Sequence, residues 1–102
     1  MSPYGLNGKL FTAPENRDAL IAILSEASAA MQALDGCYLY MVSKDADDDT
    51  ATWVTEVWEN QQAHDDAVQS ADVQAMIGKG MPLIVGAPEG ATLIPVAGAP
   101  TA

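Results

Sequence analysis

Residues 37–58, CYLYMVSKDADDDTATWVTEVW, contain two short segments rich in aromatic and branched side chains on either side of an acidic run. Side chains of this kind favour strands, and clusters of Asp favour turns. The sequence therefore predicts an antiparallel β-hairpin, with strands at 37–44 and 52–58 and a turn at 45–50. The rest of the chain is arranged around these two strands.

Upstream of the hairpin, the pattern predicts a strand at residues 4–12 and then a long helix. The strand segment, YGLNGKLFT, alternates loosely in polarity, and Pro14 follows it. Apolar residues then recur at steps of three and four, which is typical of an amphipathic helix; they are Leu20, Leu24, Ala27, Met31 and Leu34. Gly36 is expected to end this helix, because glycine readily adopts the left-handed C-cap conformation.

Downstream of the hairpin, the sequence predicts two short helices and a final strand. Asn60 and Ser70 are suitable N-cap residues, and the helices should run to about residues 70 and 77. A last strand is expected at residues 91–96. It should lie at an edge of the sheet, because Pro95 has no N–H to donate to a neighbouring strand.

This order of elements is that of the ferredoxin-like βαββαβ arrangement, an α+β fold with helices on one face of an antiparallel sheet. The length of 102 residues suits one domain, residues 1–102, with a core at about 4–96 and a tail at 97–102. Alternation within the second strand is expected to place Cys37, Leu39 and Met41 on one face and Tyr38, Tyr40 and Val42 on the other. Since both faces are apolar, we expect a second copy of the chain to cover the face that the helices leave open.

Composition excludes several classes of function. The chain has 4 Lys and Arg against 14 Asp and Glu, a net charge of −10, and its basic residues are scattered singly. This distribution argues against binding to nucleic acid or to an anionic membrane, which both require clustered positive charge. No apolar stretch approaches a membrane span and no signal peptide is apparent, so a cytoplasmic protein is expected.

The sequence also gives little support for a metal site. One His and one Cys are too few for a zinc site with four nitrogen or sulfur ligands. Asp45, Asp47, Asp49 and Glu56 have the spacing of calcium-loop ligands, but Thr50 occupies the position that requires glycine. A solvated turn is the favoured interpretation of this acidic run, and no metal is expected.

Four segments together resemble the antibiotic biosynthesis monooxygenase family: YGLNGKLFTAPENRDAL (4–20), GCYLYMVSKDADD (36–48), TEVWENQQAHD (55–65) and MPLIVG (81–86). The resemblance implies a dimeric α/β barrel. It also implies a monooxygenase that oxidises a hydroquinone or polycyclic phenol with molecular oxygen, with neither metal nor flavin as cofactor. The implied partners are a second copy of the chain, a small aromatic substrate and oxygen. The alternatives are a non-enzymatic dimer that binds a small aromatic metabolite and, less favoured, a haem-binding protein.

Such a reaction needs a base to remove the phenolic proton, and three residues are candidates for the catalytic site. His64 lies on the apolar side of its predicted helix and is the candidate base, although a histidine packed under the sheet would give the same pattern. Trp58 and Glu56 share a face of the third strand. Trp58 either stacks on the substrate or fills the core, and Glu56 is either a second acid or base or the partner of Lys9 or Arg17.

Five further residues are candidates for substrate binding. Tyr38 and Tyr40 offer phenolic hydroxyl groups, and Trp53 in the neighbouring strand offers an aromatic surface. Asn7 offers an amide in the first strand, and Met76 an apolar wall in the third helix. The alternative for the aromatic residues is packing at a dimer interface, where such residues are common.

Overall fold

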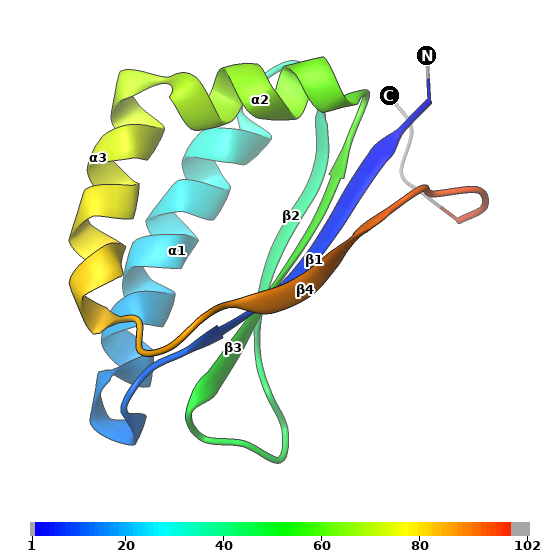
Figure 1. The fold of residues 1–102 in the computed structure, drawn as a ribbon. Coiled ribbons are helices and arrows are strands. Elements are labelled where there is room, and N and C mark those ends of the chain that lie inside the picture. The colour runs from blue at the N-terminus through cyan, green and yellow to red at the C-terminus, as the bar shows by residue number, and fades with distance from the viewer. Residues whose placement is uncertain (1, 99–102) are drawn as a thin grey trace.

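The computed structural model describes residues 2–98 and shows the ferredoxin-like order of elements (Figure 1). The elements are β1 (Tyr4–Phe11), α1 (Arg17–Gln32), β2 (Cys37–Lys44), β3 (Ala51–Trp58), α2 (Gln61–Gln69), α3 (Ala71–Gly80) and β4 (Glu89–Leu93), with short 3-10 turns at Pro14–Asn16 and Met81–Leu83. The strands pair antiparallel in the order β2-β3-β1-β4, and the helices cover one face of the sheet. The predicted α+β class is confirmed. Most of the expected tail at 97–102 lies outside the described residues.

The predicted hairpin of β2 and β3 is present, but a β-bulge alters one end of it. Cys37 pairs with Trp58 and Leu39 with Val57, so that Tyr38 is an extra residue between them. An extra residue reverses the alternation of faces. Cys37 therefore packs against the helix-covered core rather than sharing a face with Leu39, which corrects the sequence prediction.

The predicted helix ends are formed by side chains that satisfy free backbone N–H groups. The Asn60 side chain accepts from the N–H of Ala63 at 2.9 Å, and Ser70 Oγ accepts from Val73 at 3.4 Å. Gly36 has φ +88°, the left-handed conformation expected of it. The first long helix nevertheless stops at Gln32, so Leu34 lies beyond it and is 40% exposed rather than part of the buried stripe.

The final strand differs from its predicted range because of a close approach between two glycines. β4 covers Glu89–Leu93 and stops before Pro95, whereas 91–96 was predicted. Gly90 pairs with Gly8 and has φ +152°. A Cβ at position 90 would overlap the carbonyl oxygen of Asn7, so the strand can begin this early only because residue 90 is glycine.

The acidic run at 45–50 is an ordered turn that uses its carboxylates internally. Asp45 accepts from the N–H groups of Asp47 and Asp48, and its other oxygen accepts from Trp53 Nε1 at 2.8 Å. These hydrogen bonds stabilise the ionised form and lower the pKa of Asp45. Arg17 in α1 also donates to the turn, with its Nη1 2.8 Å from the carbonyl oxygen of Asp48. The spacing that resembles a calcium loop thus has a structural explanation in the turn itself.

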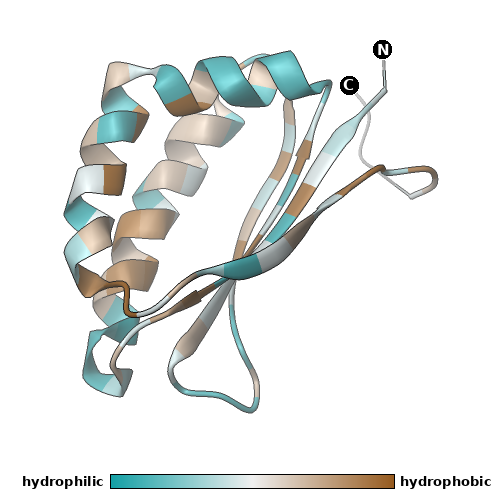
Figure 2. Ribbon diagram, in the orientation of Figure 1, coloured by the Kyte–Doolittle hydropathy of each residue, from teal (hydrophilic) through white to brown (hydrophobic). Residues whose placement is uncertain are grey.

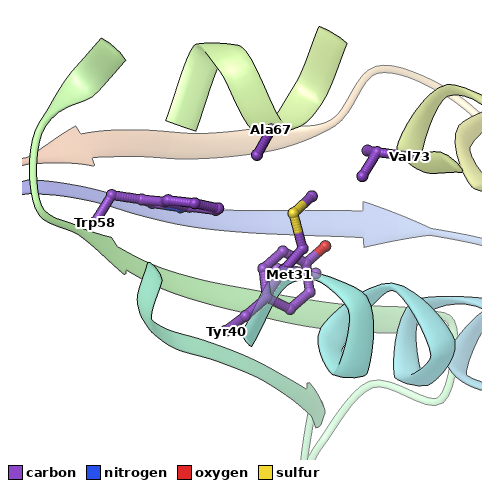
Figure 3. Close-up of a cluster of buried hydrophobic side chains, with 6 residues drawn as sticks. Met31, Tyr40, Trp58, Ala67 and Val73 are labelled. Carbon is purple, nitrogen blue, oxygen red and sulfur yellow. The ribbon is translucent and has the colours of Figure 1, made fainter. Parts of the chain in front are cut away.

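The two faces of the sheet have different environments. The inner face carries the core, formed by Met31, Tyr40, Val54, Trp58, Ala67 and Val73 (Figure 3). Register places Leu39, Met41, Trp53 and Val57 on the outer face, which no helix among residues 2–98 covers. Hydrophobic residues are accordingly distributed along the strands as well as the helices in Figure 2. No helix among the described residues is long and apolar enough to cross a membrane.

Candidate functional site

A cavity of about 170 Å³ lies between the inner face of the sheet and the helices. Most of its wall is aliphatic and comes from α1, α3 and the turn after α3; this part includes Leu20, Ile23, Leu24, Val73, Met76, Ile77, Met81 and Ile84. Three titratable side chains also line it: Tyr40, Glu56 and His64. The cavity is therefore a mainly apolar site with a few polar groups, which is the usual composition of a small-molecule site.

Glu56 and Trp58 both face the helices because residues two apart in a strand share a face. The indole Nε1 of the fully buried Trp58 donates to Glu56 Oε1 at 2.9 Å. Burial raises the pKa of Glu56, while the hydrogen bond from Trp58 and the nearby His64 act in the opposite direction. Lys9 lies near Asp45, and Arg17 donates to the hairpin turn. Neither residue is therefore the salt-bridge partner of Glu56 that the sequence suggested as one alternative.

His64 reaches the cavity from the first turns of α2, and its side chain is only 16% exposed. Its Nδ1 lies 2.9 Å from Oδ1 of Asp65. The ring packs against two aromatic neighbours, with centroids 5.2 Å from Tyr4 and, edge-on, 5.8 Å from Trp58. When Nδ1–H donates to Asp65, Nε2 is the nitrogen left with a lone pair, which is the arrangement that a general base requires.

Tyr40 stands directly opposite Glu56 on the neighbouring strand and is buried. Burial, followed by the negative charge of Glu56, raises the pKa of Tyr40 well above its usual range. This phenol therefore stays protonated and remains a hydrogen-bond donor. Of the residues that the sequence singled out, the structure brings together Tyr40, Glu56, His64 and Met76 at the cavity, with Trp58 packed behind them.

Comparison with known proteins bears on this arrangement. Residues 3–79 match the family described as antibiotic biosynthesis monooxygenase. The chain belongs to the antibiotic biosynthesis monooxygenase family. This family assignment confirms the resemblance noted from the sequence. A comparison with curated proteins finds no match.

Solved structures agree with the family assignment. A candidate antibiotic biosynthesis monooxygenase from Chloroflexus aurantiacus J-10-fl is 42% identical, covers 95% of this chain and 96% of its own, and superposes with a TM-score of 0.86. Candidate members from Caulobacter crescentus CB15 (19% identity, 93% and 91% coverage, TM-score 0.88) and Nitrosomonas europaea (10%, 96% and 94%, TM-score 0.90) share the fold. The last two show that the fold is kept at very low sequence identity.

In this family member, three of the predicted site residues lie away from the cavity. Asn7 pairs with Thr55 on the outer face, where its Oδ1 accepts from the Thr55 hydroxyl at 3.2 Å. Trp53 also lies on the outer face, with the ammonium of Lys9 5.4 Å from its ring. Tyr38 is the extra residue of the bulge and does not line the cavity.

Two features of the site were not found by sequence reasoning. The contact between Asp65 and His64 involves neighbours in the chain, so adjacency is its only signal in the sequence. The second feature is an open groove of about 360 Å³ over β1 and β4, next to Gly8 and Gly90. Glu56 borders both this groove and the cavity, because the two glycines leave that part of the inner face without side chains.

Proposed function

We propose that the chain is a monooxygenase that oxidises a phenol or hydroquinone with molecular oxygen, using neither metal nor flavin. The observation that carries this proposal is the placement of His64, Glu56 and Tyr40 on the wall of one apolar cavity. Family membership supports the reaction class, and the geometry supports the assignment of roles. The catalytic residues proposed are His64 and Glu56, with Trp58 as a positioning residue.

His64 is proposed to take the phenolic proton on Nε2, while Asp65 orients the ring through Nδ1. For a phenol with a free para C–H, the overall reaction with O₂ gives a 1,4-quinone and one molecule of water. One oxygen atom becomes the new carbonyl, and the other leaves in water with the phenolic and para hydrogens. The ring itself is oxidised and supplies the electrons, so the balance requires no external reductant.

Tyr40 and Glu56 are proposed to hold the substrate oxygen while it carries negative charge. Tyr40 remains protonated and donates a hydrogen bond to this oxygen. The Glu56 carboxyl group can donate to this oxygen only while it is protonated, the form that burial favours. Donors fixed in an apolar cavity stabilise a developing anion more strongly than water does, because the surroundings screen the interaction less.

We also propose that the functional unit is a homodimer in which the outer faces of two sheets meet. Met41 and Leu93 on this face are 47% and 48% exposed in the single chain. Leu39, Val57, Gly5 and Leu93 follow one another in register across β2, β3, β1 and β4, so an apolar row crosses this face beside Met41. Met41→Asp should shift the sedimentation equilibrium from dimer to monomer. A stable folded monomer of the unmodified chain at micromolar concentration would contradict the dimer.

A non-enzymatic binding protein is the second candidate, and the aliphatic majority of the cavity wall favours it. A buried apolar wall suffices for binding, whereas oxidation also requires the proton to be removed. Haem suits the cavity poorly, because a cavity of about 150 Å³ holds one benzene ring and a porphyrin is several times larger. Oxygen consumption with a panel of phenols and hydroquinones separates oxidation from binding alone.

His64→Ala tests the assigned base. Positioned proton transfer contributes about 10²- to 10⁴-fold, so kcat/KM for the best substrate should fall by about that factor. Gln62→Ala on the exposed side of the same helix is the matched control and should retain activity. Both variants are compared at a temperature at which circular dichroism shows them to be folded. A loss of only a fewfold in a folded His64→Ala protein would exclude His64 as the base.

A further inference from the structure

The cavity is polar at one end and aliphatic at the other. Glu56 pairs with Tyr40 and contacts Trp58, which in turn contacts His64, so the polar groups are neighbours. The aliphatic end is formed where the start of α1 meets the end of α3 and the 3-10 turn, with Leu20, Ile77 and Met81. These helix ends lie together at the lower left of Figure 1, away from the start of α2.

Strand register gives the approximate length of this cavity. Leu10 lines its aliphatic part and pairs with Thr52, four residues along β3 from Glu56. At about 3.3 Å per residue, the two ends are about 13 Å apart along the sheet. A volume of about 170 Å³ spread over that length describes a narrow slot.

The volume limits the ligand to one aromatic ring with a slim substituent. An engineered apolar cavity of about 150 Å³ holds a single benzene ring. A phenol of three fused rings has more than twice as many ring atoms and keeps the full width of a ring over its whole length. It exceeds the volume of the slot, whereas an alkyl chain attached to one ring is slimmer and matches the aliphatic end.

The charges around the cavity disfavour a ligand with a permanent negative charge. Among the described residues that line it, none is Lys or Arg, and Glu56 supplies a carboxyl group. Lys9 and Arg17 are engaged with the hairpin turn, Lys44 pairs with Asp18 on the surface, and Lys79 is exposed on α3 and does not line the cavity. A carboxylate or phosphate on the ligand would therefore bring a permanent negative charge beside the Glu56 carboxyl group without a Lys or Arg to compensate it, at a cost in free energy. A phenolic hydroxyl can instead donate to Glu56 or His64.

We propose that the ligand of this cavity is an uncharged single-ring phenol or hydroquinone with an alkyl substituent. Its hydroxyl group points toward Glu56 and His64, and its alkyl group lies in the aliphatic end. This inference rests on the proposed function for the choice of a phenol, and on volume, polarity and charge for the rest. The slot selects against fused-ring phenols and against alkyl carboxylates.

Gly80 offers a sensitive test of the aliphatic end. It lines the cavity, and a Cβ there would lie 3.4 Å from Cδ1 of Leu20, an ordinary contact that consumes cavity volume. Gly78 belongs to the same helix, and a Cβ there would meet open space. Gly80→Ala and Gly78→Ala are therefore the same substitution within one helix, but only the first narrows the slot.

Isothermal titration of the full chain with phenol, 3-propylphenol, 3-pentylphenol, 3-pentylbenzoate and 2-anthrol tests the inference. Affinity should rise about fourfold per added methylene from phenol upward until the slot is full. 3-Pentylphenol should bind at least tenfold more tightly than 3-pentylbenzoate or 2-anthrol, and Gly80→Ala, not Gly78→Ala, should weaken it severalfold. The inference is overturned if no phenol binds, if 2-anthrol or the benzoate binds as tightly, or if the two glycine variants behave alike.

Oxygen uptake by the same solutions distinguishes this inference from the proposed function. Tight binding of 3-pentylphenol without oxygen uptake would refute the oxidation and leave the ligand class standing. Oxidation of 2-anthrol at a rate above that of 3-pentylphenol would support the oxidation and overturn the ligand class.

Discussion

The hydrogen bond between Trp58 and Glu56 supports a prediction with a calculable size. Trp58 is fully buried and its indole donates to Glu56 Oε1 at 2.9 Å. A hydrogen bond to a charged group contributes about 1.5–3 kcal/mol to stability, against about 0.5–1.5 kcal/mol between neutral groups. Glu56→Gln keeps a neutral acceptor in place. The coupling free energy between Trp58→Phe and Glu56→Gln therefore isolates the charged part of the interaction, about 1 kcal/mol.

The sign of its pH dependence follows from the pKa of Glu56. Burial raises this pKa above the ordinary value of 4.5, so the ionised form is disfavoured in the folded chain. The extra stability of the unmodified protein over the Glu56→Gln variant is therefore fully present below pH 4.5. It declines as the pH rises through the pKa of Glu56 in the folded protein. The Trp58 donor acts against this decline, because it stabilises the ionised carboxylate. Its contribution is present at high pH and is lost as pH falls.

Urea unfolding of the four proteins, followed by far-ultraviolet circular dichroism at one protein concentration, measures the coupling. At about pH 8 it should be about 1 kcal/mol, and at about pH 4, where the carboxyl is protonated, it should approach zero. The packing cost of Trp58→Phe appears in both backgrounds and cancels. A coupling that is zero at both pH values, or larger at the lower one, would refute the argument that the indole stabilises the ionised Glu56.

Three further predictions concern the scaffold of the site, each checked by urea unfolding. Arg17→Met removes the hydrogen bonds to the hairpin-turn carbonyls and should cost about 1–3 kcal/mol, whereas Lys44→Met breaks an exposed pair and should cost under about 0.5 kcal/mol; equal losses would contradict the role of Arg17. Gly90→Ala should cost at least about 2 kcal/mol more than Gly8→Ala, since only the first meets backbone. Asn60→Ala removes the cap of α2 and should cost about 1 kcal/mol, and a neutral change would exclude capping.

Local rules predicted most of the fold. Strand alternation, the hairpin and both helix caps depend on residues close together in the chain, so Asn60 and Ser70 could be recognised without tertiary information. The pairing of Glu56 with Trp58 on one face followed from the period of two alone. The edge position of the last strand also followed, although Pro95, from which it was predicted, lies beyond the end of that strand.

Tertiary features were not accessible in the same way. The bulge at Tyr38 leaves no trace in the sequence. Every residue from Cys37 to Val42 is apolar or aromatic, so both possible registers give the same hydrophobic pattern on the two faces. Asn7 faces outward because the helices cover the other face of β1, and the sequence does not show which of the two faces they cover. The spacing of Leu34 fits the apolar stripe of the predicted helix, but α1 ends at Gln32, before Leu34 is reached.

The set of β3 residues that faces the helices determines both the packing of the core and the chemistry of the site. A register shift of one residue would carry Thr55 and Val57 into the cavity and move Glu56 and Trp58 to the outer face. The burial of Trp58 opposes such a shift, because a fully buried Trp contributes several kcal/mol through its apolar area. The same packing that stabilises the sheet therefore fixes the carboxyl group toward His64. It follows that Glu56 and His64 can be substituted to alter the chemistry of the cavity with less risk to the fold than Trp58, whose ring belongs to both.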